Sequence, residues 1–139
     1  MQPKLDLIGI AVKDMPRALA FYRALGLDIP AAMDGEGHAE ITLANGLRLA
    51  WDTHEVIRSF DEDWQPPSGT PRMGIAFLCD SPAEVDAHFA RLTGMGHKAH
   101  KAPWDAFWGQ RYAQVVDPDG NVIDSAIPAG MRNWEKRAK

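Results

Sequence analysis

Residues 7–14 read LIGIAVKD and residues 73–80 read MGIAFLCD, so one short pattern occurs twice in the chain. Each run is apolar and ends at an aspartate that can cap a helix. A helical pattern follows each run, with Pro16 near the start of the first and Pro82 near the start of the second. The first turn of a helix tolerates proline. The repeat therefore predicts two copies of one strand–helix unit.

The stretch after each helix has the period of a strand. Polar and apolar residues alternate over 38–43 and lead to Asn45-Gly46, a dipeptide typical of hairpin turns. In the second half, residues 112–116 run into DPDG at 117–120 and then into 121–126. Each half therefore predicts a βαβββ module. We expect an α+β fold in which the two modules form a curved mixed sheet, with helices outside and a cleft inside.

A proline-rich segment separates the two halves. Residues 66–71 read PPSGTP, which neither a helix nor a central strand accommodates. The residues before the strand at 112–116 are expected to form a loop, which carries His97, His100 and the aromatic residues Trp104, Phe107 and Trp108. We expect the chain to form one domain over residues 1–139. Its parts are module 1 at about 3–53, a linker or flap at about 54–70, module 2 at about 71–128 and a tail at 129–139.

Composition and charge exclude several classes of protein. The formal net charge of −4 argues against a nucleic-acid partner, which calls for a concentrated basic surface. The apolar stretches are too short to span a membrane, and the first residues lack the apolar core of a signal peptide, so we expect a cytoplasmic location without a membrane partner. The single cysteine, Cys79, excludes an intramolecular disulfide and a multi-cysteine metal cluster.

Three motifs carry a family resemblance. Residues 12–15 (VKDM), 21–26 (FYRALG) and 117–121 (DPDGN) resemble the vicinal oxygen chelate superfamily of glyoxalase I, extradiol dioxygenases and bleomycin-resistance proteins. This superfamily contains both metalloenzymes and metal-free drug binders, so the resemblance implies the fold more strongly than the function. Each module would leave a sheet edge unpaired, so we also expect a homodimer, with modules paired within a chain or exchanged between subunits.

Other segments are similar to one branch of that superfamily, the mitomycin-binding resistance proteins. They are residues 49–53, 58–61 with 64–65, and 103–113. This resemblance implies a homodimer that sequesters a planar quinone-type drug between a histidine and a tryptophan. The matching positions in this chain are His38 and Trp108.

The phase of His38 agrees with a binding role. His38 alternates with Ala39 and therefore lies with Glu40 on the face of its strand that we expect to line the cleft. Flat side chains on that face suit a planar conjugated ligand, because ring stacking contributes about 0.5–1.5 kcal/mol beyond area burial. The further side chains that we expect around a small aromatic ligand are Asp52, Trp64, Arg111, Gln114 and Asp124.

The superfamily's metal-ligand positions are mostly occupied by residues that cannot bind metal. The resemblance places them at Leu7, Ala50, Met73 and Asp124, whereas a catalytic ion needs about three protein ligands. We therefore predict metal-independent binding or sequestration of an aromatic molecule, with no metal, no cofactor and no catalytic residue. Two alternatives remain: a metal-dependent lyase, isomerase or dioxygenase of the same fold, and a bleomycin-type binder, which would need a strongly acidic groove.

Overall fold

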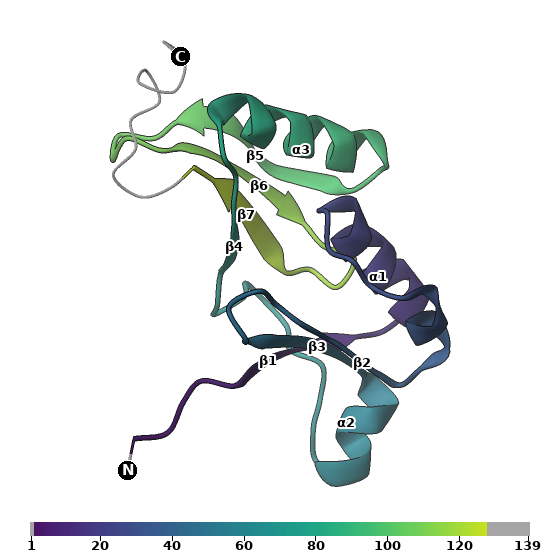
Figure 1. Cartoon of the computed structure of the whole chain (residues 1–139). Coiled ribbons are helices and arrows are strands. Elements are labelled where there is room, and N and C mark those ends of the chain that lie inside the picture. Colours follow the sequence, from purple (N-terminus) through teal and green to yellow (C-terminus); the bar gives the residue numbers. More distant parts are fainter. Residues whose placement is uncertain (1, 128–139) are drawn as a thin grey trace. The chain divides into compact units, whose positions relative to one another are not determined.

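A computed structural model of the chain describes residues 2–127, which form two compact units that divide between Ser68 and Gly69 (Figure 1). Each unit combines helices with a mixed sheet, so the fold is α+β, as the sequence predicts. Hydrogen-bonded strand pairs stay within each unit and form two mixed sheets. The predicted tail at 129–139 lies outside the described residues.

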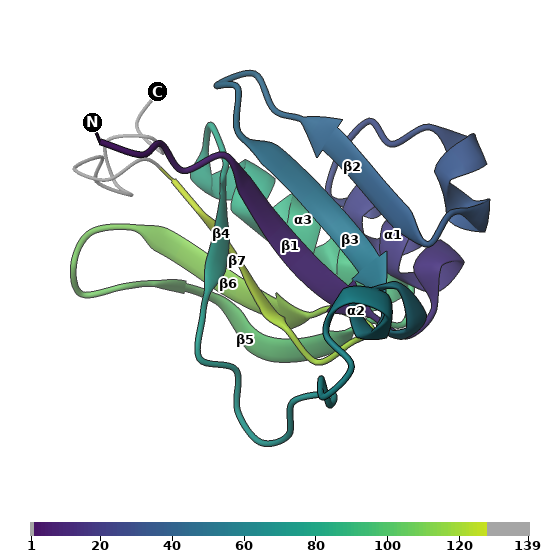
Figure 2. The ribbon, with the colours of Figure 1, turned by 90° about the horizontal axis from the view of Figure 1, so that it is seen from below.

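The first unit contains a three-stranded sheet with the order β1-β3-β2 (Figure 2). Strand β1 runs parallel to β3, and β2 runs antiparallel to it. The elements, in chain order, are β1 (Leu7–Val12), α1 (Met15–Ala24), the 3-10 helix η1 (Ala31–Gly35), β2 (His38–Thr42), β3 (Arg48–Thr53) and α2 (His54–Phe60).

Local sequence signals explain why α1 begins and ends where it does. Asp14 caps the helix, because its Oδ1 accepts a hydrogen bond from the Arg17 N–H at 3.2 Å. Two residues after the helix, Gly26 adopts a φ of +108°, which side-chain-bearing residues rarely adopt. Between these ends, Tyr22 packs against Trp51 of β3 with ring centroids 5.3 Å apart. The core of this unit therefore lies between α1 and one face of the sheet.

The second unit is a complete βαβββ module, as predicted. Its sheet has the order β4-β7-β6-β5, in which β4 and β7 are parallel and the other pairs are antiparallel. Helix α3 covers one face, where Val85 packs with Ala113, Cys79 and Ile127. The elements are β4 (Ile75–Leu78), α3 (Pro82–Gly94), β5 (Lys98–Asp105), β6 (Arg111–Val116) and β7 (Val122–Ala126).

The first unit differs from the prediction in two places. Within the described residues it has three strands, and η1 lies where the βαβββ pattern expects another, in a stretch with Pro30 and two glycines but no alternation. The segment at about 54–70, which we expect to be a linker or flap, begins with a helix that the sequence pattern did not indicate, α2. Thr53 starts this helix by accepting a hydrogen bond from the Val56 N–H at 3.3 Å, and the proline run begins only at Pro66.

Two details of the second unit also correct the prediction. Residues 98–105 form the edge strand β5 rather than a loop, and register shifts on either side of Lys101 break the alternation that would have predicted it. The residue that caps α3 is Ser81 rather than Asp80. Ser81 Oγ accepts a hydrogen bond from the Glu84 N–H at 3.2 Å, while the Asp80 N–H donates to Glu84 Oε2 at 2.9 Å.

The described helices are all too short or too polar to cross a lipid bilayer. This agrees with the short apolar stretches of the sequence. The homodimer and the cytoplasmic location remain predictions.

Candidate functional site

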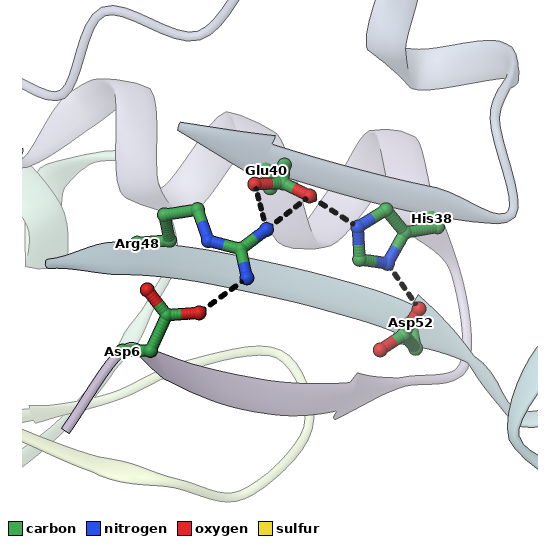
Figure 3. A network of polar contacts seen from close by, with 5 residues as sticks. All are labelled: Asp6, His38, Glu40, Arg48 and Asp52. Atoms are coloured by element: carbon green, nitrogen blue, oxygen red, sulfur yellow. Dashed lines mark hydrogen bonds and ion pairs between the residues drawn. The ribbon is translucent and has the colours of Figure 1, made fainter. Parts of the chain in front are cut away.

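A group of polar side chains covers one face of the first sheet, on β2, β3 and the residue before β1 (Figure 3). His38 lies between two carboxylates of this group. Its Nδ1 is 2.6 Å from Asp52 Oδ1, and its Nε2 is 2.9 Å from Glu40 Oε1. Arg48 continues the group toward the start of the chain, 2.9 Å from Glu40 Oε2 and 2.6 Å from Asp6 Oδ2. We call these five residues the histidine network.

The network favours the charged form of the imidazole. Ionised carboxylates accept hydrogen bonds but cannot donate them, so a ring with an N–H at each nitrogen satisfies both neighbours. The hydrogen bond to Glu40, and then that to Asp52, raises the pKa of His38 against the opposing effect of desolvation. His38, and then Arg48, lowers the pKa of Glu40. Both ring nitrogens are engaged, while the side chain is 44% exposed.

This arrangement predicts a pH-dependent contribution of His38 to stability. The pKa of His38 is higher in the folded state than in the unfolded state, where it is about 6.5. Its stabilising contribution is therefore complete below about pH 6.5 and is lost as the pH rises through the pKa of the folded state. We expect His38→Phe to lower the free energy of unfolding more at pH 5.5 than at pH 9, by under about 1 kcal/mol because the pair is exposed. Urea unfolding at both pH values measures this, with His100→Phe on the exposed edge strand as control. An equal loss at both pH values would contradict the prediction.

The second unit carries an aromatic cluster, which consists of Trp104 on β5, Phe107 and Trp108 in the following loop, and Tyr112 on β6. The Trp108 ring makes edge-to-face contacts with all three others. Its centroid lies 5.5 Å from Trp104, 4.9 Å from Phe107 and 5.5 Å from Tyr112. Phe107 is 91% exposed and Trp108 is 47% exposed. Neighbouring exposed aromatic side chains of this kind mark interaction sites.

Polar groups border the aromatic cluster on the same face of the second sheet. Asp124 on β7 pairs with Gln114 on β6, whose Nε2 donates to Asp124 Oδ1 at 2.9 Å. The Tyr112 hydroxyl donates to the other carboxylate oxygen of Asp124. Burial and this carboxylate raise the pKa of Tyr112 to about 12, so its hydroxyl stays a donor at neutral pH. The Trp104 Nε1–H is buried and has no hydrogen-bond partner among the described residues.

The structure brings several predicted site residues together within each unit. In the second unit Trp108 contacts Tyr112, which binds Asp124, and Gln114 binds the same carboxylate. In the first unit His38 binds Asp52. His38 and Trp108 belong to different units, so their meeting at one ligand remains a prediction.

Arg111 lies apart from this group. Along β6 it alternates with Tyr112, so it faces α3. There its Nε is 2.9 Å from Asp86 Oδ1 of the helix, and its Nη1 is 3.2 Å from Asp105 Oδ1. These contacts support a structural role for Arg111 rather than a contact on the side of Gln114.

Trp64 belongs to neither the histidine network nor the aromatic cluster. It follows α2, and its ring packs 4.9 Å from the ring of His54. The guanidinium of Arg58 lies 5.5 Å from the Trp64 ring centroid, in a cation–π contact. Trp64 therefore packs against α2, two residues before the proline-rich segment begins.

Comparisons with known proteins identify the family of this chain. The model of the Glyoxalase/Bleomycin resistance protein/Dioxygenase superfamily matches residues 4–124. The chain belongs to this superfamily. No curated protein matches it closely enough in sequence to count as a relative.

Solved structures show the same superfamily fold. A glyoxalase/bleomycin resistance protein/dioxygenase family enzyme from Burkholderia phytofirmans PsJN has a TM-score of 0.75 at 19% identity, over 90% of this chain and 98% of its own. A glyoxalase-related enzyme from Fulvimarina pelagi has a TM-score of 0.77 at 20% identity, over 91% and 89%. Hypothetical protein SA1046 from S. aureus reaches 0.76 at 16%, over 92% and 95%. At these identities the likeness establishes the fold alone.

The residues that the resemblance places at the superfamily's metal-ligand positions do not fit a catalytic ion in this chain. Leu7 and Ala50 carry no donor atom, and Met73 is an exposed thioether, a weak ligand for the ions concerned. Both carboxylate oxygens of Asp124 already accept hydrogen bonds from Tyr112 and Gln114. One engaged carboxylate is too few ligands for a catalytic divalent ion.

Sequence reasoning missed three residues of these groups. Arg48 and Asp6 join the histidine network through ion pairs, and no motif marks a surface ion pair between residues that far apart in sequence. Tyr112 could have been found, because it alternates in phase with Gln114 and so shares its face of the sheet.

Proposed function

We propose that this superfamily member binds and sequesters a planar aromatic or quinone-type small molecule without a metal ion, as the mitomycin-binding resistance proteins do. The observation that supports this most is the aromatic cluster. Its Trp108 ring is half exposed, is held by three other rings and lies beside donor and acceptor groups. Ligand sites commonly combine aromatic walls with a few polar groups that fix orientation.

The polar border of the cluster suits a quinone or a related carbonyl compound. The unpartnered Trp104 Nε1–H is a donor that a ligand oxygen would satisfy, which removes the cost of about 1–3 kcal/mol of burying it unpaired. Gln114 still has hydrogen-bonding capacity beyond its contact with Asp124. Trp108 would contribute the stacking surface, and these groups would set the orientation of the ligand.

His38 contributes the face of its ring rather than a proton. Both of its nitrogens are engaged by carboxylates, so no N–H is free to donate to a ligand atom. The side chain is 44% exposed, and stacking of its ring on a planar aromatic ligand needs neither proton transfer nor a net charge. We therefore assign His38 a stacking role.

The two alternative functions have weaker support. A metal-dependent lyase, isomerase or dioxygenase would need ligands that Leu7 and Ala50 do not provide. A bleomycin-type binder would need a strongly acidic groove, whereas the three carboxylates of the histidine network are opposed by Arg48 and a protonated His38. Metal-free binding of a flat and largely uncharged molecule agrees better with these side chains.

Substitution of His38 tests its assigned role. We expect His38→Phe to bind mitomycin C or a similar quinone with nearly unchanged affinity, because a ring remains. His38→Ala should weaken binding by about 1 kcal/mol, or roughly five-fold. Calorimetric titration measures both affinities, and His100→Ala serves as the matched control. Loss of binding in His38→Phe, with its fold intact by circular dichroism, would show that His38 acts through a proton or its charge.

A further inference from the structure

A further group of chemically reactive side chains lies at the start of α3, and none of its residues belongs to the aromatic cluster or the histidine network. It consists of Cys79 just after β4, Glu84 in the first turn of α3 and His88 one turn later. One ligand atom from each residue can be chosen so that all three lie within 4.8 Å of one another. Among residues 2–127, this is the group of three histidine, cysteine or carboxylate side chains whose ligand atoms lie this close together.

We propose that Cys79, Glu84 and His88 bind one zinc-like divalent cation, through the Cys79 sulfur, a Glu84 carboxylate oxygen and the His88 Nε2. Thiolate, imidazole and carboxylate are the ligands that Zn²⁺ takes in proteins, and three of them leave a fourth, tetrahedral position for water. The site is independent of the proposed ligand binding, and none of its residues occupies a metal-ligand position of the superfamily.

The distances fit this coordination. Glu84 Oε1 and His88 Nε2 are 3.4 Å apart, which is long for a charged hydrogen bond. Two ligands that bind zinc at about 2.0–2.1 Å with a tetrahedral angle are separated by about 3.4 Å. These two atoms therefore already have the spacing of two zinc ligands. The sulfur must move closer by less than about 1.5 Å to complete the set, given zinc–sulfur bonds of about 2.3 Å.

The surroundings hold two of the ligands in place. Glu84 Oε2 accepts a hydrogen bond from the Asp80 N–H at 2.9 Å, which turns the other oxygen, Oε1, toward His88. Hydrogen bonds of this kind orient the ligands of metal sites. Cys79 is 2% exposed, and burial, with Glu84 and Asp80, raises the pKa of its thiol to about 11. The bare thiol is therefore protonated at neutral pH, and binding forms an S–Zn bond while the proton passes to solvent.

One neighbour opposes the site. Arg91 Nη2 is 2.6 Å from His88 Nδ1, so this nitrogen acts as an acceptor and Nε2 carries the proton. Metal binding at Nε2 needs the other tautomer, in which Nδ1 carries the proton. Arg91 must therefore turn away, which its exposed position allows. Replacement of Arg91 with alanine should therefore tighten metal binding several-fold. If Glu84 and His88 formed only a helix-surface ion pair, this replacement would not change the affinity for metal.

A bound ion would connect the end of β4 to the first two turns of α3. Metal that binds the folded state and not the unfolded state raises stability by mass action. The expected consequence is a higher melting temperature in the presence of Zn²⁺, with unchanged affinity for a planar ligand.

Titration of the chelator-treated full chain with Co²⁺ tests the site, because a cobalt–thiolate bond produces a charge-transfer absorption that reports cysteine directly. We expect one equivalent to bind with this absorption, and Zn²⁺ to displace it. Cys79→Ser and His88→Ala should each weaken binding by more than about 100-fold. Loss of a residue that only hydrogen-bonds to a metal ligand usually has a smaller effect. His100→Ala is the matched control and should bind as the wild type does, whereas Arg91→Ala should bind more tightly.

Several outcomes would overturn the proposal. These are a cobalt complex without the charge-transfer absorption, the same absorption in Cys79→Ser, or equal affinity in His88→Ala and His100→Ala. If Cys79→Ser fails to fold, the variants of the more accessible His88 and Arg91 still decide the question, because their effects on affinity have opposite signs. Binding of mitomycin C is measured separately, so failure of this site leaves the proposed ligand binding untouched.

Discussion

Replacement of Trp108 with alanine is expected to weaken the binding of a planar quinone by about thirty- to a hundred-fold. The change removes a stacking face together with roughly 100 Å² of apolar contact, and the two together correspond to about 2–3 kcal/mol. The other members of the aromatic cluster, Trp104 and Tyr112, remain, but they now lack the ring that holds them edge-to-face. Calorimetric titration of mitomycin C into both proteins measures the loss.

The matched control is Phe60→Ala, which removes an exposed aromatic ring on α2, outside both candidate groups. It should leave the affinity unchanged within about two-fold. Unchanged affinity in Trp108→Ala would place the binding site elsewhere. The double variant His38→Ala/Trp108→Ala extends the test, because residues that contact one ligand commonly show non-additive effects. Unchanged affinity in His38→Ala would contradict the prediction that both side chains serve the same ligand.

Replacement of Trp51 with alanine is expected to produce the largest loss of stability. Trp51 is fully buried, and it packs against Tyr22 of α1 at a centroid distance of 5.3 Å. Removal of a buried tryptophan side chain leaves a cavity between helix and sheet, and such changes cost about 3–5 kcal/mol. Urea unfolding followed by circular dichroism measures the difference in the free energy of unfolding.

Two further variants make this result specific. Trp51→Phe keeps an aromatic contact with Tyr22 and removes an indole N–H that has no partner among the described residues, so its loss should be clearly smaller. Trp64→Ala removes a tryptophan that is partly exposed, and should cost about 1 kcal/mol or less. A loss below about 1 kcal/mol in Trp51→Ala would show that the core of the first unit lies elsewhere.

The sequence predicted those helices and strands that have a regular pattern of apolar residues or a clear cap or turn residue. The GIA repeat, the capping Asp14 and the hairpin at Asn45-Gly46 are local signals, and the corresponding strands and helices are present. Helix α2 was missed because its residues were assigned, with the nearby proline run, to a linker or flap. Thr53 is nevertheless a good N-cap residue for this helix. Strand β5 was missed because bulges interrupt its alternation. In both cases local irregularity concealed a regular element.

The candidate site was predictable to the extent that it follows strand phase. The alternation of His38 with Ala39 correctly placed the imidazole on the polar face, where it meets Glu40. The same rule, applied to β6, separates Arg111 from Gln114, because positions that differ by an odd number lie on opposite faces. Contacts between distant residues, such as Arg48 with Asp6 or Cys79 with His88, depend on side-chain conformation and tertiary placement, which no sequence period encodes.

The central claim is that this superfamily member binds a flat aromatic molecule without metal and leaves it unchanged. Its most direct test is calorimetric titration of a panel of planar quinones, including mitomycin C, into the wild-type chain before and after dialysis against EDTA, with mass spectrometry of the recovered ligand. The account predicts saturable binding of at least one member of the panel, with the same affinity after chelation and an unaltered ligand mass. Absence of binding across the panel, binding that needs an added metal ion, or a chemically converted ligand would contradict it.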